Sequence, residues 1–232
     1  MKVDIVGNCC TWTRQLCTSY IIDDEILFDA PSGSFKTLMH DYDLKKINYI
    51  IISHFHSDHF LELFIVFDYI FKCCPNKKLT LIAPKGCQER LDNLFRILEI
   101  SYLTELVNRN VTFIDSENNK KVKLGQYSIQ MFKMAHGELD AYGYVINNVG
   151  FTGDTSMCNN VRKILKKSSA CFIDTAAVAI NNKHMAVGEV IALQDEFSSC
   201  KLYPMHLSEM SMQELDYLGK RHLSQGETVY ID

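Results

Sequence analysis

Three histidines and one aspartate lie within six residues of one another, in the segment His54-Phe55-His56-Ser57-Asp58-His59. This segment directly follows the apolar, β-branched run 47–52, which is typical of a buried strand. Histidines two residues apart point to the same side of extended backbone, and an Asp-His pair on a turning chain can face the same point. Imidazole with carboxylate suits zinc, iron or manganese. The spacing therefore predicts a metal-binding loop at a strand end; the alternative is a polar loop of no fixed geometry.

Three further polar residues come directly after predicted strands: His136, Asp154 and His206. Each residue alone is typical of a surface position or a helix cap. All three, however, leave strands at the edge where loops build sites, as the first cluster does. We therefore expect them to join that cluster in one pocket.

The rest of the chain alternates short apolar runs with amphipathic stretches. Predicted strands cover 2–7, 19–22, 25–28, 47–53, 79–83, 111–114, 127–134, 142–146, 149–152, 170–174, 202–205 and 228–231. Predicted helices cover 34–42, 61–72, 84–98, 159–167 and 187–197, and a last helix begins with a capping box at 211–214. No repeat or linker appears, so we expect a single domain over residues 1–232. Two mixed sheets covered by helices, an α/β fold, would satisfy this order of elements.

The composition and the charge count against several classes of protein. A net charge of −4 gives no basic surplus, which counts against a long nucleic acid held by charge. The nine cysteines contain no Cys-x-x-Cys, and the chain begins with a predicted strand rather than a signal peptide. We therefore expect reduced thiols in a cytoplasmic protein. The longest apolar stretch, 60–71, contains Glu62 and Asp68 and is too short for a membrane, so we expect no membrane association.

The clustered motif, His136, Gly153-Asp154-Thr155 and His206-Leu207-Ser208 together resemble the metallo-β-lactamase superfamily over nearly the whole chain. The resemblance implies a four-layer αββα sandwich with two divalent metal ions between its sheets. We expect zinc (Zn2+), with Mn2+ or Fe as alternatives that the same ligands accept.

The same resemblance implies how the ligands are shared between the two ions. One metal would be held by His54, His56 and His136, and the other by Asp58, His59 and His206. Asp154 would bridge them, since a carboxylate offers two oxygens and an imidazole one nitrogen.

Several segments are similar to the ribonuclease Z and cyclic phosphodiesterase branch, among them 14–20, 26–30 and 183–189. In that branch Asp29 would orient a metal-binding histidine, and His184 would donate a proton to the leaving group. Asp174 stands where the branch has a glutamate that positions this histidine. As alternatives, Asp29 could simply begin a turn and His184 could be an ordinary residue before a helix.

One feature departs from the ribonuclease Z pattern. That branch inserts a long tRNA-grasping arm where this chain has a single predicted hairpin between His136 and Asp154. The departure again counts against a long nucleic acid as partner. A homodimer is expected from the resemblance alone.

We therefore predict a two-metal phosphodiesterase for a small phosphodiester such as a cyclic nucleotide. A metal-bridging hydroxide would attack phosphorus, Asp58 would orient it, and His184, positioned by Asp174, would protonate the departing oxygen. The nearest alternative is a thioester or lactone hydrolase, which needs no separate acid for a thiolate. An alternative of another class is a non-catalytic protein that binds metal or a nucleotide, although a purely structural site closes with four ligands.

Overall fold

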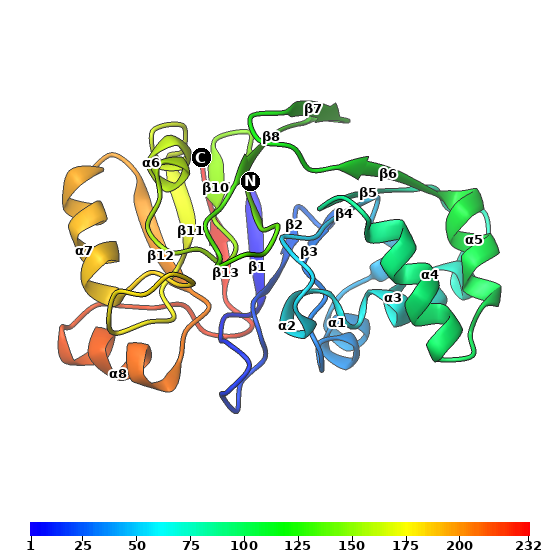
Figure 1. Ribbon diagram of the computed structural model, residues 1–232, viewed down its shortest axis with the longest axis horizontal. Helices are drawn as coiled ribbons and strands as arrows, with labels where there is room; N and C mark the ends of the chain where they lie inside the picture. The colour runs from blue at the N-terminus through cyan, green and yellow to red at the C-terminus, as the bar shows by residue number, and fades with distance from the viewer.

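Two mixed β-sheets lie face to face at the centre of the computed structural model, which describes residues 1–232 (Figure 1). The first sheet has seven strands in the order β13 (Thr228–Tyr230), β1 (Lys2–Gly7), β2 (Ser19–Ile22), β3 (Ile26–Phe28), β4 (Tyr49–Ile51), β5 (Leu79–Ala83) and β6 (Val111–Asp115). The second has six strands in the order β12 (Lys201–Met205), β11 (Ala170–Asp174), β10 (Val149–Phe151), β9 (Tyr142–Ile146), β8 (Tyr127–Lys133) and β7 (Lys121–Leu124).

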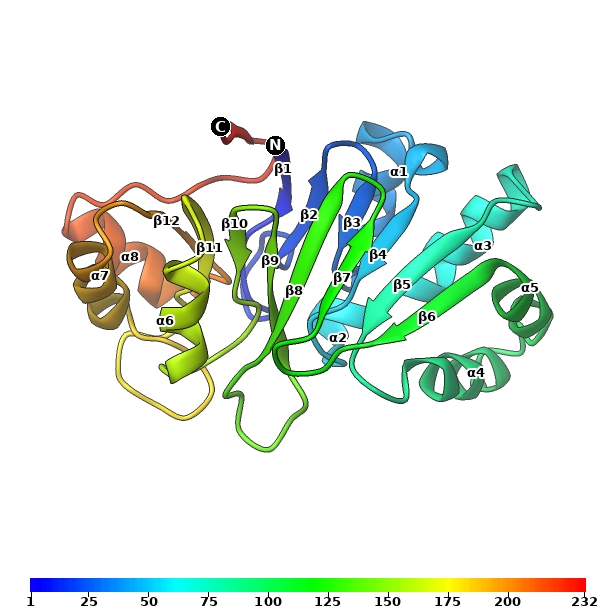
Figure 2. The ribbon, with the colours of Figure 1, turned by 90° about the horizontal axis from the view of Figure 1, so that it is seen from above.

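Helices cover the outer face of each sheet, as the view from above shows (Figure 2). On the first sheet these are α1 (Phe35–Asp41), the 3-10 turn η1 (Leu44–Lys46), α2 (Ser57–Phe60), α3 (Leu63–Cys73), α4 (Cys87–Ile97) and α5 (Tyr102–Asn110). On the second sheet they are α6 (Asn159–Leu165), α7 (Val187–Glu196) and α8 (Glu209–Tyr217). The predicted four-layer αββα sandwich, an α/β fold, is confirmed.

Apolar spacing explains how the layers pack. Helix α3 buries Leu63, Val66, Phe67, Ile70 and Phe71, a one-sided stripe that lies against the first sheet. Strands β3 to β6 run parallel, and β4 and β5 are almost wholly apolar because both of their faces are covered. A second apolar core fills the space between the sheets, and a third lies under α6 and α7.

The functional segments all lie just beyond strand ends. His54, His136 and Asp154 are each the third residue after the end of a strand, β4, β8 and β10 respectively. His206 directly follows β12. This is the position in which loops of an α/β fold gather ligands.

Some predicted element boundaries are wrong. The predicted helix 61–72 is α3, which begins two residues later, at Leu63; the short helix α2 precedes it and overlaps the His54–His59 segment. The predicted helix from Pro84 begins only at Cys87, because Gly86 adopts a left-handed φ of 86°. The last helix begins at Glu209, two residues before the predicted capping box, because Ser208 is its N-cap and forms the capping box with Ser211.

Four elements were absent from the prediction: η1, α2, α5 and β7. Helix α5 follows α4 after a short turn, and β7 joins β8 at the edge of the second sheet. Strand β7 alternates exposed and half-buried residues, a weak pattern for so short an edge strand. None of the helices combines the length and the apolar surface that a membrane span requires.

Candidate metal centre

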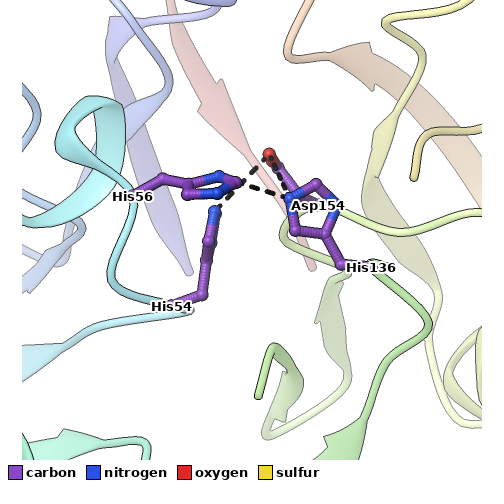
Figure 3. A group of neighbouring side chains, drawn as sticks. All are labelled: His54, His56, His136 and Asp154. Carbon is purple, nitrogen blue, oxygen red and sulfur yellow. Dashed lines mark hydrogen bonds and ion pairs between the residues drawn. The ribbon is translucent and has the colours of Figure 1, made fainter. Parts of the chain in front are cut away.

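The seven predicted ligands converge from both halves of the chain. One group comprises His54, His56, His136 and Asp154, whose ligand atoms all lie within 4.8 Å of one another (Figure 3). In the figure, the two histidines of the loop after β4 face His136 and Asp154 across the pocket. A second group comprises Asp58, His59 and His206 at the same mutual spacing.

Asp154 lies between the two groups. Its Oδ2 is 3.7 Å from His54 Nε2 and 3.8 Å from His136 Nε2. Its Oδ1 is 3.3 Å from His59 Nε2, while Oδ2 is also 3.2 Å from His206 Nε2. The carboxylate therefore faces both groups, as a bridging ligand must.

These separations suit ligands that share a cation. Two nitrogen or oxygen ligands, each ~2.1 Å from one ion, lie about 3.0 Å apart at a right angle and about 3.6 Å apart at 120°. His56 Nδ1 and His136 Nε2 are 3.3 Å apart, and His59 Nε2 and Asp58 Oδ2 are 3.9 Å apart. Several of the inward atoms are buried and have no hydrogen-bond partner: His54 Nε2, His59 Nε2 and Asp154 Oδ1. Buried polar atoms are normally paired, so the centre fits two divalent metal ions.

Hydrogen bonds on the outer side of each ring decide which nitrogen faces the centre. His136 Nδ1 donates to the Lys183 carbonyl oxygen at 2.8 Å, because a carbonyl can only accept. His59 Nδ1 lies 2.7 Å from Asp29 Oδ2 and donates to that carboxylate. In both rings the Nε2 lone pair is left free to bind a metal.

Asp29 holds more than one part of the metal loop. Besides His59, it accepts hydrogen bonds from the Ser53 backbone N–H and the Ser53 hydroxyl, each at 2.7 Å. Its backbone has a left-handed φ of 58°, and that of His206 has a φ of 57°. Such conformations cost free energy in non-glycine residues and cluster at functional sites.

Burial and charge together set the protonation of the centre. Burial acts to raise the pKa of the Asp154 carboxyl, but the imidazoles of His206 and His59 outweigh it and hold that pKa well below its usual range. Burial lowers the pKa of His54 well below its usual range, and the neighbouring His59 adds to the effect. The Asp154 carboxylate is therefore ionised and the His54 imidazole neutral, which is the protonation state of metal ligands. Burial acts to lower the pKa of His59, but the carboxylates of Asp154 and Asp29 outweigh it and raise that pKa well above its usual range.

The predicted proton donor and its partner lie beside this centre. His184 Nδ1 is 2.9 Å from Asp174 Oδ2 and 4.0 Å from Asp154 Oδ2. Asp174 is buried and also accepts hydrogen bonds from the backbone N–H groups of Thr155 and Ala176. The His184 side chain is 24% exposed, whereas the ligand histidines that form ion pairs are at most 5% exposed. His184 thus lies where the pocket meets solvent.

One contact was missed by the sequence analysis. The Thr11 hydroxyl donates a 2.6 Å hydrogen bond to Asp58 Oδ2. Burial acts to raise the pKa of Asp58, but His59 and the Thr11 hydrogen bond outweigh it and lower the pKa. Thr11 lies in the loop that follows strand β1. This position after a strand is the only feature of the sequence that could have indicated a contact with the site.

Known proteins resemble this chain in sequence and in structure. A family model described as a β-lactamase superfamily domain matches residues 25–207. Ribonuclease Z of Staphylococcus saprophyticus is 30% identical over 122 residues, which are 52% of this chain and 38% of that protein. The chain therefore spans well under half of the length of that relative.

Solved structures extend the similarity to the whole fold. A diphosphatase from the PhnP family superposes with a TM-score of 0.81 at 16% identity, over 100% of this chain and 98% of that one. The short form of human tRNase Z superposes with a TM-score of 0.74 at 17% identity, over the full length of both chains. At such identities these structures show a shared fold. The observation that relates the chain to a known family is the match to the family model. The chain belongs to the β-lactamase superfamily.

Proposed function

We propose that the chain is a two-metal phosphodiesterase acting on a small phosphodiester such as a cyclic nucleotide. The observation that carries the proposal is the His184–Asp174 pair beside the ligand groups, at 2.9 Å. Phosphodiester cleavage expels an alkoxide, which is a poor leaving group unless an acid protonates it. The relative named ribonuclease Z and the neighbour named diphosphatase support chemistry at phosphorus.

The ligand residues in this proposal are His54, His56, Asp58, His59, His136, Asp154 and His206. Bound divalent cations supply Lewis-acid charge for the phosphate oxygens and lower the pKa of water. We propose zinc, with manganese and iron as the alternatives that imidazole and carboxylate also accept. Metal analysis of the purified protein tests this choice.

The residues of the chain have distinct roles in the proposed reaction. Asp58, ionised and held by Thr11, accepts a hydrogen bond from the attacking water and aims it at phosphorus. His184 holds the proton that the leaving oxygen takes. Asp174 is a positioning residue that fixes the orientation of the His184 ring through Nδ1.

A small substrate and a homodimer are further parts of the proposal. Only the hairpin of β9 and β10 separates His136 from Asp154, and the net charge is −4. Neither feature offers a grip for a long polynucleotide. Gel filtration of the purified chain tests the homodimer.

Replacing His184 tests the proposed function most directly. We expect His184→Ala to retain its metal content and to lose ~10²–10⁴-fold in kcat on bis-p-nitrophenyl phosphate and a cyclic nucleotide. His40→Ala is the matched control, because the His40 side chain is 86% exposed and belongs to none of the ligand groups.

The same assay decides between a phosphodiesterase and a hydrolase of carbonyl substrates. For this purpose a thioester and nitrocefin are assayed beside the phosphodiesters, at equal metal loading. Equal phosphodiester turnover in wild type and His184→Ala would reject the acid role. Thioester turnover without phosphodiester turnover would instead favour a carbonyl substrate, whose thiolate leaves without an acid.

A further inference from the structure

Trp12 is the only tryptophan of the chain and is 90% exposed. It lies in the loop between β1 and β2, which Figure 1 shows in dark blue, projecting from the fold between α2 and α8. An indole has a large apolar face that is usually at least partly covered. Single exposed aromatic residues are nevertheless common, so exposure alone assigns nothing.

The position of Trp12 relative to the metal centre distinguishes it from other exposed aromatics. Thr11, its neighbour in the chain, donates a 2.6 Å hydrogen bond to Asp58 Oδ2. Consecutive Cα atoms are about 3.8 Å apart, so the Trp12 backbone lies within one residue of a direct contact to the centre. The loop that carries the exposed indole therefore borders the centre.

The loop that carries Trp12 is fixed at its base. The Cys10 N–H donates to the carbonyl oxygen of Leu207, the residue after His206, at 2.9 Å. The Thr13 hydroxyl lies 3.2 Å from the Cys10 carbonyl oxygen, closing a turn around Trp12. At Gly7 a Cβ atom would lie 2.2 Å from the Cys17 carbonyl oxygen, so the two ends of the loop cross too closely for any side chain. An exposed side chain on a fixed loop is already placed for binding.

A free cationic group accompanies the indole. Arg14 is exposed, and the arginine ion pairs of the chain involve Arg162 and Arg221 instead. A guanidinium binds phosphate oxygens and also stacks on flat rings. The loop thus presents an aromatic face and a cation together, the combination that proteins use to bind nucleotides.

We propose that Trp12 is a specificity residue that stacks on the base of a nucleotide substrate, with Arg14 attracting its phosphate. This inference rests on the proposed phosphodiesterase and narrows its substrate class to phosphodiesters that carry a nucleoside. The phosphate would lie at the ligand groups, and the base would lie outward along the loop. The phosphate group would bind at the ligand groups in the same way whether or not the ester carries a nucleoside.

Fluorescence tests the stacking without requiring turnover. Because Trp12 is the only tryptophan, all tryptophan emission of the full chain comes from this loop. We expect AMP to quench the emission of the metal-loaded protein saturably, and ribose 5-phosphate, which lacks the base, to leave it unchanged. Equal responses to both ligands, or none to AMP, would overturn the proposal.

Kinetics with two esters of one leaving group test specificity. Thymidine 5′-(p-nitrophenyl phosphate) carries a nucleoside, whereas methyl p-nitrophenyl phosphate does not. We expect Trp12→Ala to raise KM for the nucleoside ester by about 5- to 150-fold, to leave kcat nearly unchanged, and not to affect the methyl ester. Trp12→Phe should restore part of the loss, because it keeps an aromatic face.

The control and the possible outcomes separate the two proposals. Tyr230→Ala removes another exposed aromatic residue, which pairs with Lys2 at the far end of β1, and should change neither ester. An equal rise in KM for both esters would reject base stacking and leave the phosphodiesterase proposal standing. If no phosphodiester is hydrolysed, the AMP titration still decides whether the loop binds a base.

Discussion

At the scale of single residues, one carboxylate controls the orientation of a proposed metal ligand. Asp29 holds His59 Nδ1 at 2.7 Å and both hydrogen-bonding groups of Ser53, the residue before His54. It does so from a left-handed backbone conformation, which asparagine also tolerates. A substitution by asparagine therefore changes the charge with little change in the backbone.

We expect Asp29→Asn to weaken metal binding by about 10- to 100-fold, because the His59 ring loses the carboxylate that fixes its tautomer. Competition against a chromogenic chelator measures this affinity. Asp24→Asn is the matched control, since Asp24 has a similar φ of 60° but lies in the turn between β2 and β3. Unchanged affinity in Asp29→Asn would show that Asp29 only begins a turn.

The convergence of the seven proposed ligand residues could be predicted from the sequence, because four of them form a compact motif and the other three follow strands. The contact of Thr11 with Asp58 could not be predicted, since it joins residues 47 positions apart and leaves no local pattern. The same holds for the His136 hydrogen bond to the Lys183 carbonyl, which is a backbone group present at every position. Contacts between residues far apart in the chain cannot be predicted from the spacing of residue types in the sequence.

At the scale of elements, helix α1 receives its cap from another segment. Its own N-cap residue, Ser34, makes no side-chain hydrogen bond to the helix. The Glu62 carboxylate accepts instead from the Gly33 N–H at 2.7 Å and the Phe35 N–H at 2.5 Å. A carboxylate at this end also suits the helix dipole. Glu62 thereby links α1 to the metal-binding segment His54–His59, whose last residue lies three positions before it.

We expect Glu62→Ala to lower the free energy of unfolding by about 1–2 kcal/mol, because two backbone N–H groups lose their acceptor. Glu62→Gln should recover part of this, since its amide oxygen accepts hydrogen bonds without the charge. Urea unfolding measures both variants. Glu105→Ala, on the exposed face of α5, should change stability by no more than about 0.5 kcal/mol.

Among the elements, apolar runs bounded by polar turns were predictable, whereas the mostly polar α5 and β7 were not. Strands β5 and β11 have the predicted bounds, because both are continuous apolar runs between polar turns. The short helix α2 could not be foreseen, because it covers only residues 57–60 of a segment that the sequence indicates as a polar loop.

At the scale of the whole molecule, Tyr144 joins the two sheets just below the metal loop. It lies in β9 of the second sheet, and its hydroxyl donates to the carbonyl oxygen of Ile52, at the end of β4 in the first. The same hydroxyl lies 2.8 Å from Ser116 Oγ. Its ring packs edge-to-face on Phe28 in the core between the sheets. One side chain therefore sets the spacing of the sheets beside the centre.

We expect Tyr144→Phe to lower the free energy of unfolding by about 1–3 kcal/mol, because the Ile52 carbonyl is left buried without a donor. The unfolding curve should keep a single transition, as the predicted single domain over residues 1–232 requires. Tyr217→Phe, at an 89% exposed position, is the control and should be neutral. Two separate transitions would contradict the single domain.

The ligand groups draw on both sheets: His54 and His59 follow β4 of the first, and Asp154 and His206 follow strands of the second. Cations bound there would stabilise the packing of the two sheets, because the sheets could separate only if some ligands left an ion. The supply of metal in the cell would then govern how long each folded copy survives proteolysis, as well as how fast it works.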